Sequence, residues 1–217
     1  MRAAIAIVIA MCATAHAQAL DVAAVSDGTN IVTVTTGVEH GLVLGAGYER
    51  GLEVAGRPII VGGDVALSAA GLDPRDFRVR AGVLAPIVRH GCWQWSGGGD
   101  AMVRGTSDDI AQMIDIGLAA QTLAGYYARR WFAAAELGFD WALATHIAPS
   151  DGYRMLVYAG ARDGWYHNTG GLVRAGAQAG IAFGRNDVTL RAGALRYDSG
   201  APPMIPFYAT LGYDRRW

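Results

Sequence analysis

The chain has 217 residues, of which 52% are apolar and 17% are charged. Its 18 basic residues are all arginine. Together with 19 acidic residues they give a formal net charge of −1. A near-neutral chain without basic clusters argues against nucleic acid as a partner. After residue 17, no stretch offers the roughly 18 uninterrupted apolar residues that a membrane-spanning helix needs.

The first 17 residues have the order of a secretory signal peptide. Arg2 precedes an apolar run over residues 3–11, and Ala15-His16-Ala17 forms an A-x-A site ahead of Gln18. This order predicts export and cleavage near Gln18. We therefore expect a removed segment, residues 1–17, and one mature domain, residues 18–217.

The cysteine count fits an exported chain without disulfides. Cys12 lies in the segment expected to be removed, which leaves Cys92 alone. A single cysteine cannot form an internal bridge, and an oxidising compartment favours an inert thiol. We expect Cys92 to be buried.

Apolar and polar residues alternate along most of the mature chain, which is the period-two pattern of β-strands. Because the alternation is unbroken over residues 32–48, the first two strands could also be one long strand paired with residues 20–26. The pattern predicts strands at residues 30–39, 42–52, 58–70, 77–87, 93–104, 114–127, 131–146, 173–183, 188–194 and 205–217.

Short and long connections alternate between the predicted strands. The short ones lie near residues 53–57, 90–91, 129–130 and 185–187, and the longer ones near residues 71–76, 105–112, 147–170 and 198–204. Only the turn at residues 40–41 breaks the rule. Membrane β-barrels have short periplasmic turns and longer outer loops, so this asymmetry predicts the orientation. The longest loop has room for a helical turn over residues 153–158.

One face of the strands is apolar, and the other combines glycine with balanced charges. In a lipid bilayer, strands satisfy their backbone groups only by closing into a barrel. The charged face then lines a lumen that ten strands leave narrow, whereas a soluble barrel would have its apolar face inside. We expect an interior charge network of Asp64, Arg78, Arg80, Asp115, Glu136, Asp140, Arg174 and Arg191, with Asp100, Arg104, Asp214 and Arg216 on the same face.

The last strand, IPFYATLGYDRRW, places Phe207, Leu211, Tyr213 and Trp217 on one face and ends on an aromatic residue. It resembles the closing strand of bacterial outer-membrane β-barrels, in which this strand also serves as the assembly signal. The resemblance implies a Gram-negative outer membrane, contact with its lipid and lipopolysaccharide, and recognition by the barrel-assembly machinery. Arg215 shares the outward face and must reach water at the headgroup level.

Signal peptide, strands and terminal strand together resemble small outer-membrane barrels of the opacity-protein-like type. We expect an all-β, closed antiparallel transmembrane barrel of about ten strands, with eight or twelve as alternatives. Tryptophans at strand ends near the short turns are typical of an interfacial girdle. These are Trp93, Trp95, Trp131 and Trp217.

Two other sequence features have a functional and a structural interpretation. His146, with Ser150 and Asp151 just beyond it, could act as a general base at the rim, as in outer-membrane lipid A deacylases and omptin proteases. However, Ile147-Ala148-Pro149 replaces the expected His-x-Ser-Asn stretch, and an anchoring histidine is the structural alternative. The aromatic and arginine residues of residues 153–167 fit either a recognition surface or a loop folded over the mouth.

Glycine clusters and metal-ligand spacings predict no cofactor site. Residues 45–47 lack the third glycine of a dinucleotide loop, and residues 97–99 are interpreted as a bend or bulge. No metal spacing is present. We therefore expect a non-enzymatic outer-membrane protein with a filled lumen and a structural or surface-interaction role. A narrow channel for small polar solutes and a rim-located lipid or peptide hydrolase are the alternatives.

Overall fold

The computed structural model describes residues 25–39, 41–69, 74–199, 203 and 205–217. In this part of the chain there are ten strands and one short helix, which confirms the predicted all-β fold. The predicted signal peptide lies outside the described residues. The elements are β1 Asn30–Val38, β2 Leu42–Val54, β3 Arg57–Ser68, β4 Phe77–His90, β5 Trp93–Ser107, β6 Ala111–Tyr127, β7 Trp131–Pro149, α2 Asp151–Leu156, β8 Gly164–Phe183, β9 Asn186–Tyr197 and β10 Phe207–Arg216.

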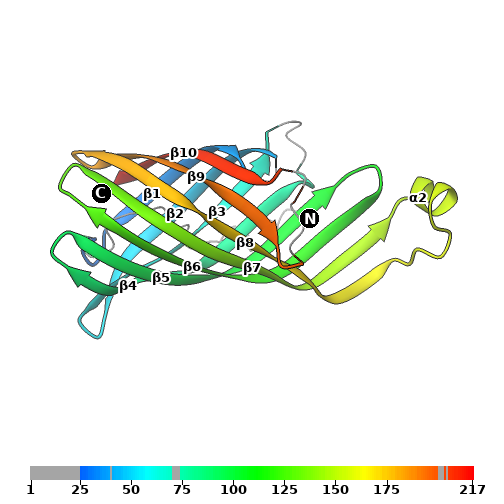
Figure 1. Ribbon diagram of the computed structural model, residues 1–217, viewed down its shortest axis with the longest axis horizontal. Coiled ribbons are helices and arrows are strands. Elements are labelled where there is room, and N and C mark those ends of the chain that lie inside the picture. The colour runs from blue at the N-terminus through cyan, green and yellow to red at the C-terminus, as the bar shows by residue number, and fades with distance from the viewer. Residues whose placement is uncertain (1–24, 40, 70–73, 200–202, 204) are drawn as a thin grey trace, which may run out of the picture.

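The strands close into a single antiparallel barrel (Figure 1). Each strand pairs with its neighbours in sequence, and β1 pairs with β10, for example Val34 opposite Tyr213. Two backbone hydrogen bonds fasten the last residue to the first strand, Asn30 N to Trp217 O at 3.1 Å and Trp217 N to Asn30 O at 3.0 Å. Closure leaves neither edge strand unpaired, as a lipid environment requires.

The two ends of the barrel differ. Four short connections, residues 55–56, 91–92, 128–130 and 184–185, lie together with Trp217 at one end, which we call the turn end. The other connections form the loop end, where the β7–β8 hairpin extends furthest and is tipped by α2 (Figure 1). The predicted separation of short turns and longer loops is present, with two corrections.

Both corrections concern loops that were predicted too long. β5 and β6 are joined by only residues 108–110, not by residues 105–112, and in the loop predicted at residues 147–170 both ends, residues 147–149 and 164–170, are strand. There β7 and β8 continue as a paired ladder, with Ile147 opposite Gly164. Within the remaining loop, Ser150 caps the N-terminus of α2, and its hydroxyl accepts a hydrogen bond from Tyr153 N at 3.1 Å. The alternation of polarity fails there because both faces of this hairpin are partly exposed to solvent.

Two local predictions were wrong. Residues 97–99 are not bulged but continue β5, and the register shift lies in β4, between Pro86 and Val88, opposite Ser96 and Trp95. Pro86 has no N–H for the ladder, so a local irregularity is expected beside it. Cys92 is exposed rather than buried, because it lies in the tight β4–β5 turn, next to Gly91 at a φ of 58°.

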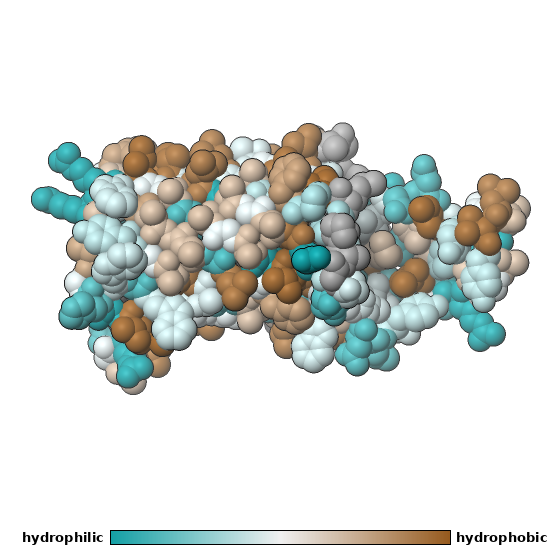
Figure 2. All heavy atoms as spheres, viewed as in Figure 1, coloured by the Kyte–Doolittle hydropathy of each residue, from teal (hydrophilic) through white to brown (hydrophobic). Residues whose placement is uncertain are grey.

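The outer face of the wall is apolar. Figure 2 shows apolar and weakly polar side chains over most of the visible wall, with many of the strongly hydrophilic ones towards the ends. Large exposed apolar side chains of the strands include Val34, Leu44, Val83, Val103, Ile116, Leu118, Leu137, Phe139, Ile181, Leu190 and Leu211. The charged face is therefore turned into the lumen.

Among the described residues, no helix has the length and apolarity that crossing a membrane would require.

Candidate functional site

The middle of the lumen is filled by ion pairs between neighbouring strands. Asp64 of β3 accepts from Arg80 Nε at 3.1 Å and from Arg78 Nη2 at 3.3 Å. Arg78 also pairs with Glu39, the residue that follows β1. Arg80 is only 2% exposed and Asp64 6%. Pairing offsets the desolvation of these buried charges, and loss of one partner would leave the other uncompensated.

A second group of contacts is centred on Glu136 of β7. Arg191 of β9 donates to both of its carboxylate oxygens, from Nε at 3.1 Å and from Nη2 at 3.0 Å. Gln178 of β8 and Tyr208 of β10 donate to the same carboxylate. The Arg191 guanidinium also lies over the Tyr208 ring, 5.7 Å from its centroid. One carboxylate therefore joins four consecutive strands, β7 to β10.

Two further ion pairs lie towards the loop end. Together with the contacts of Asp64 and Glu136 they form what we call the charged layer. Asp115 Oδ2 accepts from Arg104 Nη2 at 2.7 Å, and its Oδ1 accepts from Thr145 Oγ1 at 2.6 Å. Arg174 Nη2 donates to Asp140 Oδ1 at 2.9 Å. The structure thus places all eight residues of the expected network on the inner face, in four sets of contacts.

Separate polar contacts lie at the turn end. Arg216 pairs with Asp187 at 3.0 Å, and Thr33 Oγ1 donates to Asp214 Oδ1 at 2.5 Å. Asp214 is fully buried. These contacts join β1, β10 and β9 on one side of the lumen.

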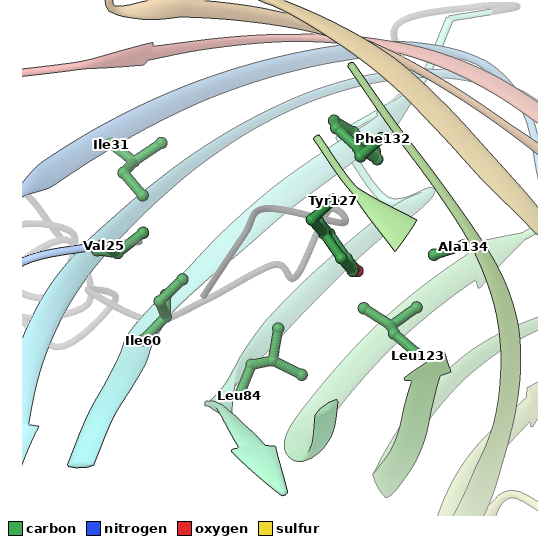
Figure 3. Close-up of a cluster of buried hydrophobic side chains, with 8 residues drawn as sticks. All are labelled: Val25, Ile31, Ile60, Leu84, Leu123, Tyr127, Phe132 and Ala134. Atoms are coloured by element: carbon green, nitrogen blue, oxygen red, sulfur yellow. The ribbon is translucent and has the colours of Figure 1, made fainter. Parts of the chain in front are cut away.

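The other side of the turn end holds a group of buried apolar side chains, with the fully buried Glu49 opposite Ile31. A cluster of buried side chains lies inside the barrel there (Figure 3), and its members are Val25, Ile31, Ile60, Leu84, Leu123, Tyr127, Phe132 and Ala134. Interior packing of this kind excludes water. The sequence interpretation missed this cluster, although Ile31, Leu123 and Phe132 have the inward parity of their strands and could have signalled it.

A vestibule opens above the charged layer at the loop end. Two cavities of about 420 and 270 Å³ share Arg104, Thr106, Met113 and Tyr197. Arg104 is the most exposed arginine of the charged layer, with a side chain 31% accessible. Methionine, phenylalanine, leucine and isoleucine side chains supply much of the remaining wall. The lumen is therefore open at the loop end, next to Arg104 and Asp115.

The rim residues singled out in the sequence make contacts with their neighbours. His146 Nε2 lies 3.1 Å from Asp163 Oδ1, and both side chains are partly exposed. The Ser150 hydroxyl donates to the backbone oxygen of Asp109 at 2.8 Å and caps α2. His146 also packs edge-on against Trp165, 5.2 Å between ring centroids. These contacts fit an anchoring histidine, and the Ser150 hydroxyl is engaged by Asp109 and Tyr153.

The residues of the proposed assembly signal and the aromatic girdle lie on the outer face. Phe207, Leu211, Tyr213 and Trp217 are all exposed, and Tyr213 Oη donates to Asn186 Oδ1 at 2.7 Å. At the turn end, the Tyr126 ring stacks on Trp131 at 5.4 Å and meets Trp93 edge-on at 5.5 Å. Arg215 is also exposed on this face, at the end of β10.

No group of three or more His, Cys, Asp or Glu side chains in the described part of the chain could hold a metal ion.

Comparison with known proteins shows the fold. No protein-family model matches the chain, and no curated protein sequence matches it. Among solved structures, the chain is similar to the COG4313 outer membrane channel from Pseudomonas putida F1, with a TM-score of 0.53 and 15% identity. The match covers 93% of this chain and 100% of that one. The class defined here is the closed, ten-stranded antiparallel β-barrel; membership of the opacity-protein-like family is not confirmed.

Proposed function

We propose that this protein is an integral outer-membrane β-barrel whose lumen is closed and whose role is structural or a surface interaction. The observation that supports a closed lumen is the succession of the charged layer and the apolar cluster. Arg80, Arg191 and Asp64 are almost completely buried in the first, and Ile31, Ile60 and Leu84 in the second. The lumen then offers solutes a vestibule rather than a passage.

The outer surface supports the membrane part of the proposal. Outer-membrane barrels present an apolar band about 25 Å tall between two aromatic girdles. Here Trp93, Trp131 and Trp217 are exposed at the turn end, and Trp141 and Trp165 are exposed on the half of the β7–β8 hairpin towards the loop end. On this proposal the turn end faces the periplasm and the loop end the cell exterior.

The same proposal includes the export and assembly route. Residues 1–17 would direct secretion, and the face of β10 that bears Phe207, Leu211 and Trp217 would be recognised by the barrel-assembly machinery. Lipid and lipopolysaccharide would then surround the wall. The proposal also includes a relationship between this protein and small outer-membrane barrels of the opacity-protein-like type.

Cell fractionation and gel migration test the membrane part. The protein should be recovered with outer membranes and should migrate differently before and after boiling, because a closed barrel stays folded in detergent until heated. Recovery as a periplasmic protein with a single migration would contradict the proposal. A Leu211→Asp, Trp217→Ala double variant should accumulate unfolded, whereas Tyr158→Ala, at the exposed tip, should assemble normally.

A narrow channel for small polar solutes is the second candidate. It is favoured by the structural similarity to a solved outer-membrane channel and by the vestibule, which would form the entrance. Conduction would require movement of the charged layer. Stable conductance steps that are altered by Arg78→Gln or Arg80→Gln, and not by Arg216→Gln, would establish this candidate in place of the closed lumen.

A further inference from the structure

Residues 25–29 lie at the turn end, ahead of the first strand. Val25 is 5% exposed and belongs to the buried apolar cluster, where Figure 3 shows it beside Ile31 and Ile60. Ser26 and Asp27 are exposed. The segment therefore covers the apolar cluster with one buried side chain and turns polar residues towards solvent.

Gly51 of β2 provides the surface on which this segment rests. Gly28 N donates to Gly51 O at 2.9 Å, and Gly51 N donates to Thr29 O at 2.8 Å. A Cβ on Gly51 would collide with Val25 Cγ1 and would lie 2.5 Å from the Ser26 backbone oxygen. Only a residue without a side chain leaves room for the segment at this position.

Apart from these two hydrogen bonds to β2, the backbone hydrogen bonds given for the segment lie within it or at its junction with Asn30. The segment folds on itself, with Thr29 N donating to Ser26 O at 3.1 Å and the Ser26 and Thr29 hydroxyls 2.8 Å apart. Asn30, by contrast, is tied into the closure of the barrel through Trp217. Movement upstream of Asn30 would thus leave the β1–β10 ladder intact, and Gly28, at a φ of 79°, is the conformationally permissive residue between them.

We propose that residues 25–29 form a displaceable plug that closes the turn end of the lumen. Their departure admits water to Ile60 and Ile31 without opening the wall, because the ladders of all ten strands remain. This inference rests on the barrel architecture alone. It holds whether the charged layer above the plug conducts or not.

Thiol accessibility tests the plug in the outer-membrane protein. Cys92 is exposed at the same end. Its labelling by a membrane-impermeant maleimide therefore shows that the reagent reaches the turn end. An Ile60→Cys thiol should label about tenfold more slowly than Cys92, because labelling requires local opening. Adding Gly51→Ala should raise the rate at Ile60→Cys to about that of Cys92. Any cysteine retained upstream adds equally to every sample, so the comparison is unaffected.

Two further variants separate displacement from general loosening. Gly47→Ala is the matched control on the same strand and face, because its added Cβ comes no closer than 3.1 Å to Gly63 O and touches no residue of the plug; it should leave Ile60→Cys protected. Val25→Asp should expose Ile60→Cys as Gly51→Ala does, because an unpaired charge is not tolerated in the apolar cluster. Its position outside the strands preserves the barrel, as heat-dependent migration will verify.

The proposal is overturned if Ile60→Cys labels as fast as Cys92 in the barrel with Gly51 and Val25 intact. It is also overturned if Ile60→Cys stays protected in both Gly51→Ala and Val25→Asp. Neither result bears on the closed charged layer, which conductance tests separately.

Discussion

The Tyr208 hydroxyl donates to Glu136 Oε1 across two intervening strands, from β10 to β7. The ring reaches that far because it crosses Gly193 of β9 and Gly176 of β8, where an added Cβ would collide with the Tyr208 hydroxyl. The absence of side chains at these two glycines leaves room on the inner wall for the long Tyr208 side chain. A single buried carboxylate thereby ties the closing strand to the body of the barrel.

Two substitutions at this contact should differ in their effect on the free energy of unfolding. One removes a single hydrogen bond, and the other removes the counter-charge of a buried arginine. Tyr208→Phe removes one donor but leaves Glu136 with Arg191 and Gln178, so the free energy of unfolding should fall by about 1 kcal/mol. Glu136→Gln leaves the Arg191 guanidinium buried without its counter-charge, and the expected loss is about 3 to 5 kcal/mol. Urea unfolding in lipid vesicles, followed by tryptophan fluorescence, measures both. Equal effects of the two changes would contradict the contact.

Glycine at the crossing point is itself testable. Gly176→Ala should destabilise the barrel by about 1 to 3 kcal/mol, because the added Cβ collides with the Tyr208 hydroxyl and with the Ala192 backbone oxygen. The matched control is Gly164→Ala, since a Cβ at Gly164 meets no atom within 4 Å. The same unfolding measurement compares them. If Gly176→Ala is no worse than Gly164→Ala, Tyr208 does not cross β8 as described.

The destabilisation caused by a charge on the outer wall should depend on how deep in the bilayer the charge lies. Leu118 lies midway along β6 and is 47% exposed, so Leu118→Arg should destabilise the barrel in a bilayer by about 2 to 4 kcal/mol. Trp93→Arg, at the turn end, should lose no more than about 1 kcal/mol from its charge. Vesicle unfolding gives both values. An equal tolerance at the two positions would mean that the wall does not face lipid.

His146 should prove structural. Its contact with Asp163 joins two partly exposed groups, and such pairs contribute less than about 1 kcal/mol. Mass spectrometry of lipid A should give the same acyl pattern from cells that produce the parent protein, His146→Ala or neither. Loss of an acyl chain with the parent protein that is absent with His146→Ala would restore the rim hydrolase.

Residue parity predicted the faces of the barrel, because one face meets an apolar and the other a charged environment over the whole depth of the wall. That is why Asp64, Arg80 and Glu136 could be placed inside from the sequence. Direct cross-strand pairs follow from hairpin register, as for Arg80 opposite Asp64 and Arg104 opposite Asp115.

Other contacts could not be predicted in this way. Tyr208 reaches Glu136 across strands that are distant in sequence, so its inward parity gave no partner. Glu39 follows β1, next to a turn whose position was ambiguous, and its contact with Arg78 depends on that turn. Val25 precedes the first strand and has no alternation around it to indicate that it is buried. The outer part of the β7–β8 hairpin shows no alternation of polarity, so its strands were not predicted there.

Planar-bilayer recording tests the central claim, the closed lumen, most directly. Purified protein whose insertion is verified by heat-dependent migration should give no reproducible conductance steps above the bare bilayer, because the charged layer and the apolar cluster fill the lumen in succession. Stable steps of uniform size that change with Arg80→Gln, and not with Arg216→Gln, would contradict it and identify an open path through the charged layer.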